Sequence, residues 1–162
     1  MDEKTVIIYA SPKADSFTAK LLKEKFGDCK GAYFYNCFKA LPHPCFDCGF
    51  CKTKEGCAFS DLDKFYEKFE KANRVIFAFP IYNCGLPAPL KALVDRFQRF
   101  YNARFVLNKR PPVKGEREVF VLMTCGSEQD QAESVLKQLT PMFTISGCHL
   151  KEYYLIKGTD NI

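Results

Sequence analysis

Short apolar runs alternate with stretches of helical spacing along most of the chain. The runs are rich in β-branched and aromatic residues, which is typical of buried strands. We expect strands at residues 5–10, 32–36, 74–80, 119–124 and 149–156. Apolar side chains recur at helical spacing in the segments between them, which predicts helices at residues 16–26, 62–69, 89–97 and 135–143.

Local signals set some of the boundaries. Ser60 shortly precedes Leu62 and is a candidate N-cap for the second helix. Pro80 ends the third strand because proline supplies no ladder donor, and Pro89 suits the first turn of the third helix.

Near-continuous apolar strands with single helices between them require a parallel sheet covered on both faces. The fold class is therefore α/β, doubly wound, with residues 1–162 as one domain and a cysteine-rich insertion at about residues 37–60. The sequence stops about six residues after the last strand, so we expect the last helix to be missing and part of one sheet face to need a partner subunit. Ligands of such sheets bind beyond the carboxyl ends of the strands.

Composition narrows the class of protein. With 47% hydrophobic and 27% charged residues the chain is not disordered, and its apolar runs are far shorter than the roughly twenty residues of a membrane span. The charged start lacks the apolar region of a signal peptide, so a cytoplasmic location is expected. The net charge is +5, but basic and acidic residues are interspersed, so neither a nucleic acid nor a membrane is expected as a partner.

The chain has nine cysteines, and an odd number without a signal peptide indicates reduced thiols, metal ligation or redox chemistry rather than disulfides. Cys45, Cys48, Cys51 and Cys57 follow the spacing C-x2-C-x2-C-x5-C. The two-residue gaps let a chain wrap a cubane, as in bacterial ferredoxins, which favours a [4Fe–4S] cluster. Zinc also accepts four thiolates, and four unligated thiols with a labile disulfide are the third interpretation.

Three loops should form the site, because they follow the first, third and fourth strands. In the first loop, Ser11, Ser16 and Thr18 stand beside free helix amides and Lys13, which suits a phosphate; the plainer interpretation is that Asp15 or Ser16 is an ordinary N-cap. The second loop, residues 80–89, is stiff and partly apolar, which suits a flat heteroaromatic ring or simply a rigid turn. The third loop, residues 124–127, would close the site, or is only a turn and a cap.

The remaining cysteines and histidines carry weaker signals. Cys84 and Cys125 lie in these loops, where each is interpreted first as a small buried hydrophobe and second as a redox thiol. Cys29, Cys37 and Cys148 are interpreted as structural. His43 and His149 lack a recognisable catalytic setting, so acid–base catalysis by a side chain is not indicated.

Several motifs resemble those of the flavodoxin-like NADPH-dependent FMN reductases. Residues 10–18 are similar to the family's Gly-Ser-Pro-Arg phosphate motif ending in Asn-Thr, although Ala10, Lys13 and Phe17 replace the glycine, arginine and asparagine. Residues 80–82 and 90–96 are similar to its Pro-Ile-Tyr loop and its Leu-Lys-x-x-x-Asp-Arg helix. The cysteine spacing is similar to that of the iron–sulfur flavoproteins within this family.

The resemblance implies a flavodoxin-like sheet of order 2-1-3-4-5 that binds FMN. The residues implied around the FMN phosphate are Ser11, Lys13, Ser16, Phe17 and Thr18. Those implied around the flavin ring are Pro80, Ile81, Tyr82, Asn83, Cys84, Gly85, Thr124, Cys125 and Gly126.

The function implied is an FMN-dependent oxidoreductase or electron-transfer flavoprotein that relays electrons between flavin and a [4Fe–4S] cluster. The resemblance implies NAD(P)H as the electron donor and a ferredoxin or a small molecule as the redox partner. It also implies that the protein assembles as a homodimer or homotetramer. Aerobic preparation is expected to leave the cluster out. Two alternatives stay open: a cluster-free NAD(P)H-dependent FMN or quinone reductase, and a non-enzymatic, zinc-stabilised interaction module.

Overall fold

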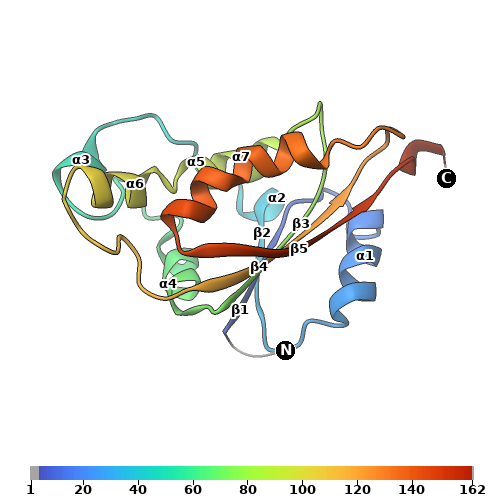
Figure 1. Ribbon diagram of the computed structural model, residues 1–162, viewed down its shortest axis with the longest axis horizontal. Helices are drawn as coiled ribbons and strands as arrows, with labels where there is room; N and C mark the ends of the chain where they lie inside the picture. Colours follow the sequence, from blue (N-terminus) through green and yellow to red (C-terminus); the bar gives the residue numbers. More distant parts are fainter. Residues whose placement is uncertain (1–3, 162) are drawn as a thin grey trace.

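The computed structural model describes residues 4–161 and contains one five-stranded parallel sheet (Figure 1). Its order, β2-β1-β3-β4-β5, confirms the predicted fold class and sheet order. Every neighbouring pair of strands is parallel. The strands are β1 (Thr5–Tyr9), β2 (Tyr33–Asn36), β3 (Arg74–Pro80), β4 (Arg117–Thr124) and β5 (Cys148–Ile156).

The four predicted helices are present, and three more appear among the described residues. The predicted ones are α1 (Phe17–Phe26), α4 (Asp63–Lys71), α5 (Ala88–Asp95) and α7 (Ala132–Ile145). The others are α2 (Cys37–Ala40), α3 (Phe50–Thr53) and α6 (Gln98–Phe105). The proposed cap at Ser60 is wrong: α4 begins after Leu62 without a side-chain cap, and Ser60 only accepts a bond from the Asp63 amide through its carbonyl (3.0 Å).

The two faces of the sheet are covered unequally. Helices α4, α5 and α7 bury one face in a large apolar core that includes Phe65, Leu90 and Val135. The opposite face packs mainly on α1, through Leu21 and Leu22. After β5 the described chain adds the 3-10 turn η1 (Thr159–Asn161).

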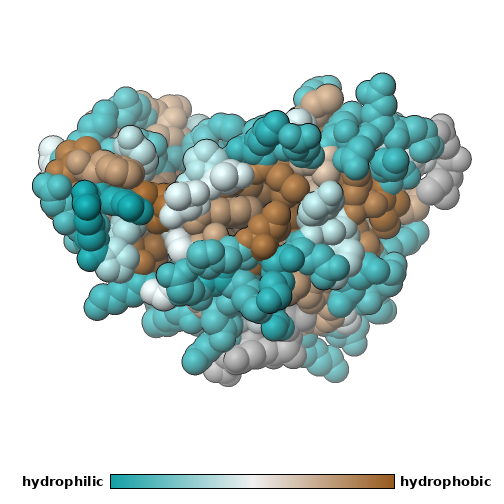
Figure 2. Space-filling model, in the orientation of Figure 1, coloured by the Kyte–Doolittle hydropathy of each residue, from teal (hydrophilic) through white to brown (hydrophobic). Residues whose placement is uncertain are grey.

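Apolar side chains stay exposed on the edge strands of the sheet. Phe34 on β2 is 48% exposed, and Leu150 and Tyr153 on β5 are 43% and 46% exposed. In the view of Figure 2 an apolar band crosses the molecule over α7 and β5. Both edge strands of the sheet therefore present apolar side chains to solvent.

Candidate functional site

The three predicted loops lie together at one end of the sheet. Strands β1, β3 and β4 are neighbours, so the segments after Ala10, Pro80 and Thr124 emerge side by side. Two backbone bonds join the strand ends: the Ala10 amide donates to the Ala78 carbonyl (2.9 Å), and the Ile81 amide donates to the Thr124 carbonyl (2.7 Å). This end is where ligands of doubly wound sheets bind.

The first loop leads into the N-terminus of α1, and Ser16 is the N-cap of that helix. Its Oγ accepts a bond from the Ala19 amide (3.1 Å) and lies 3.0 Å from the Tyr9 hydroxyl. The first intrahelical bond runs from the Lys20 amide to the Ser16 carbonyl, so the amides of Phe17 and Thr18 precede the helical ladder. The capping role of Ser16 is thus observed, and those two amides stay available to an anion.

The other first-loop residues differ in their surroundings. Ser11 is 4% exposed, whereas Lys13 lies in solvent. Thr18 is buried, and its hydroxyl lies 2.9 Å from that of Thr124, which ties the first loop's helix to the third loop. The side chain of Phe17 is partly buried beneath the Lys20 ammonium group, which lies 5.3 Å from the ring centroid.

The second loop forms a tight reverse turn. The Tyr82 amide donates to the Gly85 carbonyl (3.1 Å), and the Gly85 amide donates to the Tyr82 carbonyl (2.9 Å). Asn83 and Cys84 both have left-handed backbone angles, with φ of 50° and 58°. Such angles are uncommon for residues other than glycine, and tight turns of this kind need them.

The expectation that Cys84 is a small buried hydrophobe is wrong, because this turn exposes it. The turn is anchored on α7 instead, since the Cys84 carbonyl accepts bonds from Ser134 Oγ (3.2 Å) and Gln138 Nε2 (3.3 Å). Tyr82 is 45% exposed beside it. The loop therefore presents an aromatic ring, a carboxamide and a thiol to solvent.

The third loop packs against the end of the described chain. Cys125 is 3% exposed, which confirms its prediction as a buried hydrophobe. Its amide donates to the Ile156 carbonyl (2.8 Å), and its carbonyl accepts from the Thr159 amide (3.1 Å). The carboxylate of Asp160 lies so close to Gly126 that a Cβ there would be 2.1 Å from Oδ2. A larger residue at this position would have to displace the Asp160 side chain of the 3-10 turn.

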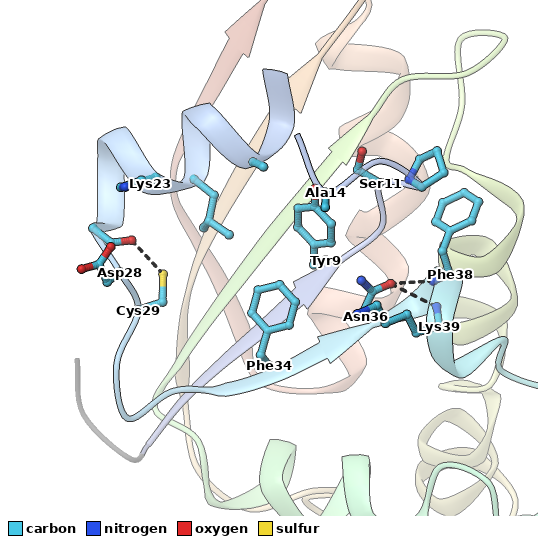
Figure 3. Close-up of a pocket in the computed structure, with 14 residues that line it drawn as sticks. Tyr9, Ser11, Ala14, Lys23, Asp28, Cys29, Phe34, Asn36, Phe38 and Lys39 are labelled. Carbon is cyan, nitrogen blue, oxygen red and sulfur yellow. Dashed lines mark hydrogen bonds between the residues drawn. The ribbon is translucent and has the colours of Figure 1, made fainter. Parts of the chain in front are cut away.

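A cavity of about 580 Å³ lies beneath the first loop, on the α1 side of the sheet (Figure 3). Its walls include the rings of Tyr9 and Phe34, whose centroids are 5.4 Å apart, together with Leu22 of α1. Ser11 and Pro12 of the first loop also line it. None of the residues that line it comes from the second or third loop, so this cavity is separate from the place where the three loops meet.

The four spaced cysteines surround one small enclosed cavity. Cys45, Cys48, Cys51 and Cys57 all line a space of about 20 Å³. Phe46, Phe50, Phe59 and Arg96 are among its other walls. Within residues 4–161, no three His, Cys, Asp or Glu side chains are arranged to hold a metal ion. The fold therefore brings the four thiols to a common space without placing their sulfurs in coordination geometry.

Arg96, at the end of α5, braces the base of the cysteine-rich insertion. It is 2% exposed and donates from Nη1 to the His43 carbonyl (2.8 Å) and from Nη2 to the Phe59 carbonyl (3.0 Å). Nη2 also lies 3.0 Å from Asp61 Oδ1. Burial by itself would raise the pKa of Asp61, but the His43 amide and Arg96 stabilise the carboxylate and hold that pKa below its usual value.

Two features beside the cysteines escaped the sequence analysis. The Nε of Arg96 is buried without a hydrogen-bond partner among the described residues. The buried side chain of Asn102, on α6, donates from Nδ2 to Cys51 Sγ over 3.1 Å. The only sequence signal for either feature is the arginine that ends the motif at residues 90–96. Helix α6, which carries Asn102, was not predicted.

The cysteines interpreted as structural are inert where they are buried. Burial raises the pKa of the Cys37 thiol to about 12 and that of Cys148 to about 11. Cys29 is only partly buried, and its Sγ lies 3.5 Å from the Gly27 carbonyl. Burial also raises the pKa of Cys29, so this thiol is a weak nucleophile as well.

The topology and the three adjoining loops define a flavodoxin-like α/β protein. The sequence pattern of the NADPH-dependent FMN reductases matches residues 4–160, so the chain belongs to that family. Among the helices of residues 4–161, none combines the length and the apolar character that crossing a bilayer needs.

Curated relatives are similar over parts of the chain. An iron-sulfur flavoprotein of Methanosarcina thermophila is 38% identical over 68 residues, which are 41% of this chain and 36% of that protein. An iron-sulfur flavoprotein of Methanocaldococcus jannaschii is 27% identical over 135 residues, 82% of this chain and 64% of that protein. The chain thus spans less than two thirds of the length of either relative.

The fold is shared with solved structures. An FMN-dependent NADH-azoreductase of Bacillus anthracis, solved in complex with FMN, superposes with a TM-score of 0.68 at 16% identity. The superposition covers 98% of this chain and 89% of that chain. At this identity the likeness establishes the fold alone.

Proposed function

We propose that the protein binds FMN where the loops after β1, β3 and β4 meet, and that it acts as an FMN-dependent NAD(P)H oxidoreductase. The observation that carries the proposal is the joining of the first and third loops through Thr18 and Thr124, at the ligand-binding end of the sheet, in a chain of the FMN reductase family. Bound FMN would supply the electron chemistry, accepting two electrons from a nicotinamide and passing them on singly or together.

The chain's own residues would hold and orient the cofactor. The amides of Phe17 and Thr18, helped by Ser11, Ser16 and Lys13, suit the phosphate because a helix N-terminus attracts anions. The flavin ring would lie among the residues of the second and third loops. These are Pro80, Ile81, Tyr82, Asn83, Cys84, Gly85, Thr124, Cys125 and Gly126. No side-chain acid or base is needed for this electron chemistry.

We further propose that Cys45, Cys48, Cys51 and Cys57 hold a [4Fe–4S] cluster that exchanges electrons with the flavin. An all-sulfur donor set around one cavity supports this, and so does the similarity to proteins named iron-sulfur flavoproteins. Arg96, which lines the same cavity, has a buried Nε without a partner among the described residues, and this also fits an additional acceptor there. Zinc would use the same thiolates.

The test is an absorption spectrum, with iron, sulfide and zinc analysis, on protein purified without oxygen. We expect flavin bands together with iron and sulfide. Flavin without metal would favour the alternative of a cluster-free FMN or quinone reductase. Zinc without flavin would favour the alternative of a zinc-stabilised interaction module. An absence of flavin bands after FMN is added would exclude any FMN-dependent function.

A matched pair of variants tests the ligands separately. Cys48→Ser should lose iron and sulfide while it keeps FMN. Cys84→Ser, which changes another exposed cysteine outside the insertion, should keep both iron and sulfide. An unchanged iron content in Cys48→Ser would exclude Cys48 as a ligand.

The assembly and the redox partner are proposals as well. We propose a homodimer or homotetramer, because a single long helix, α1, covers one face of the sheet and Phe34 and Tyr153 stay exposed. Light scattering of the purified chain would show a monomer mass if this is wrong. A ferredoxin or a small-molecule acceptor would take the electrons, and stopped-flow oxidation of the reduced protein by each would separate them.

A further inference from the structure

A buried nitrogen without a partner belongs to a side chain that lines the four-cysteine cavity. Both terminal nitrogens of Arg96 make hydrogen bonds, to His43, Phe59 and Asp61, whereas its Nε makes none among the described residues. Leaving a buried donor unpaired costs about 1–3 kcal/mol, and native proteins seldom do so. Arg96 is one of the residues that line the cavity shared by the four thiols, which makes a group held by those thiols a candidate for the missing acceptor.

A second donor reaches the same group of cysteines from another helix. Asn102 is 2% exposed, and its Nδ2 lies 3.1 Å from Cys51 Sγ, within bonding range for a sulfur acceptor. Helix α6, which carries Asn102, packs on α3, which carries Cys51 (Figure 1). This contact is independent of Arg96, because Asn102 lies on a different helix and its hydrogen bond to Cys51 Sγ is already present in the structure.

We propose that Arg96 and Asn102 are hydrogen-bond donors to the iron–sulfur cluster and its thiolates, and that they stabilise the reduced cluster. The inference rests on the proposed function, since it requires a cluster at these cysteines. Reduction adds negative charge to the cluster, so N–H donors aimed at its sulfurs favour the reduced state and raise the reduction potential.

The arginine acts through a directed bond as well as through its charge. Asp61 lies 3.0 Å from Nη2 and offsets part of that charge. An arginine side chain is not deprotonated in proteins, so the guanidinium keeps its charge and its N–H donors.

The first test replaces Asn102 with leucine, which fills a similar volume and lacks the N–H donor. Wild type and Asn102→Leu are reconstituted with iron and sulfide without oxygen, and the potential is measured by a titration followed by electron paramagnetic resonance. We expect equal iron and sulfide contents and about a tenfold smaller equilibrium constant for reduction, which is about 59 mV lower for a one-electron couple. Tyr101→Leu, on the same helix but exposed and outside the cavity, should keep the wild-type potential.

The second test replaces Arg96 with lysine, which keeps a cation but has no nitrogen at the Nε position. Its potential should fall in the same direction, and Arg99→Lys, three residues further along the chain and not lining the cavity, should leave the potential unchanged. Arg96 also braces the insertion, so Arg96→Lys can lose the cluster altogether. In that case the reduction potential of Asn102→Leu decides whether the inference holds.

The outcomes separate this inference from the function on which it rests. Full iron and sulfide with unchanged potentials in both variants would overturn the inference and leave the cluster in place. A wild-type protein that binds neither iron nor sulfide under reconstitution would overturn the cluster itself, and the inference with it.

Discussion

The hydroxyl groups of Thr18 and Thr124 lie 2.9 Å apart in the buried interior, although the two residues are 106 positions apart in the sequence. Thr18 belongs to the first turn of α1, and Thr124 is the last residue of β4. This single bond holds two of the loops proposed to surround FMN at a fixed separation. A ligand that spans both loops therefore meets a preorganised site.

Replacing either threonine by valine should destabilise the protein, because the remaining hydroxyl stays buried without this partner. We expect Thr18→Val and Thr124→Val each to lower the free energy of unfolding by about 1–3 kcal/mol. The double variant should lose less than the sum, since two apolar groups then face each other. Urea unfolding of all four proteins measures the coupling, and strictly additive effects would show that the bond contributes nothing.

Ser16 combines a structural role with a proposed binding role. Ser16→Ala removes the cap of α1 and should cost about 1 kcal/mol of stability. If Ser16 also binds the phosphate, the dissociation constant for FMN should rise about fivefold, which corresponds to one hydrogen bond of about 1 kcal/mol. Fluorescence titration of FMN measures this.

Thr144→Ala is the control for Ser16→Ala, because Thr144 Oγ1 also bonds to the backbone, donating to the Thr140 carbonyl (3.0 Å), but at an exposed position on α7 outside the three loops. It should leave stability and FMN affinity nearly unchanged. A loss of stability in Ser16→Ala with unaltered FMN affinity would leave Ser16 as a helix cap only.

Arg117 holds three segments together from inside the protein. Its guanidinium, 1% exposed, donates to five backbone carbonyls. These belong to Phe69, Glu70, Lys114, Gly115 and Ser146. Arg117→Met removes the cost of burying a charge but leaves these carbonyls without their donor, so we expect a net loss of at least about 3 kcal/mol.

Guanidinium chloride unfolding would measure the loss, with Arg110→Met as the control at an exposed arginine. A stability of Arg117→Met within 1 kcal/mol of wild type, on the order of one ordinary hydrogen bond, would show that the five carbonyls find other partners.

The strands could be predicted because their signal is local. Runs such as residues 74–80 are apolar at nearly every position, and burial on both faces of a parallel sheet requires this pattern. Helix α6 was missed because its polar and apolar residues do not separate cleanly: Asn102 is buried while Tyr101 and Phe105 are exposed. Helix periodicity cannot identify a helix of this kind.

In the candidate site, too, features that depend on neighbouring residues could be predicted, and features that depend on residues far apart in the sequence could not. The loops after β1, β3 and β4 followed from the strand order, so their meeting was expected. The bracing by Arg96 could not be predicted, since its partners His43, Phe59 and Asp61 lie 53, 37 and 35 residues away. The exposure of Cys84 was not predicted because it depends on a tight turn in which Asn83 and Cys84 both have left-handed backbone angles. A glycine at either position would have indicated such a turn, and neither residue is a glycine.

The ion pair between Asp61 and Arg96 predicts a loosening of the cysteine-rich insertion in acid. The pKa of Asp61 lies lower in the folded protein than the value of about 3.9 expected in the unfolded chain. Its contribution to stability is therefore complete above that unfolded value and is lost as the pH falls through the lower folded value. Hydrogen exchange of residues 43–61 between neutral pH and pH 2 should show the loss.

Asp61→Asn isolates this carboxylate from the others. The variant should be less stable than wild type at neutral pH, and the difference should shrink as the pH falls below about 4, because wild type then loses the same charge. Asp15→Asn, at a carboxylate whose side chain is 94% exposed, is the control and should follow wild type throughout. A difference between Asp61→Asn and wild type that stays constant down to pH 2 would show that the charge of Asp61 does not hold the insertion.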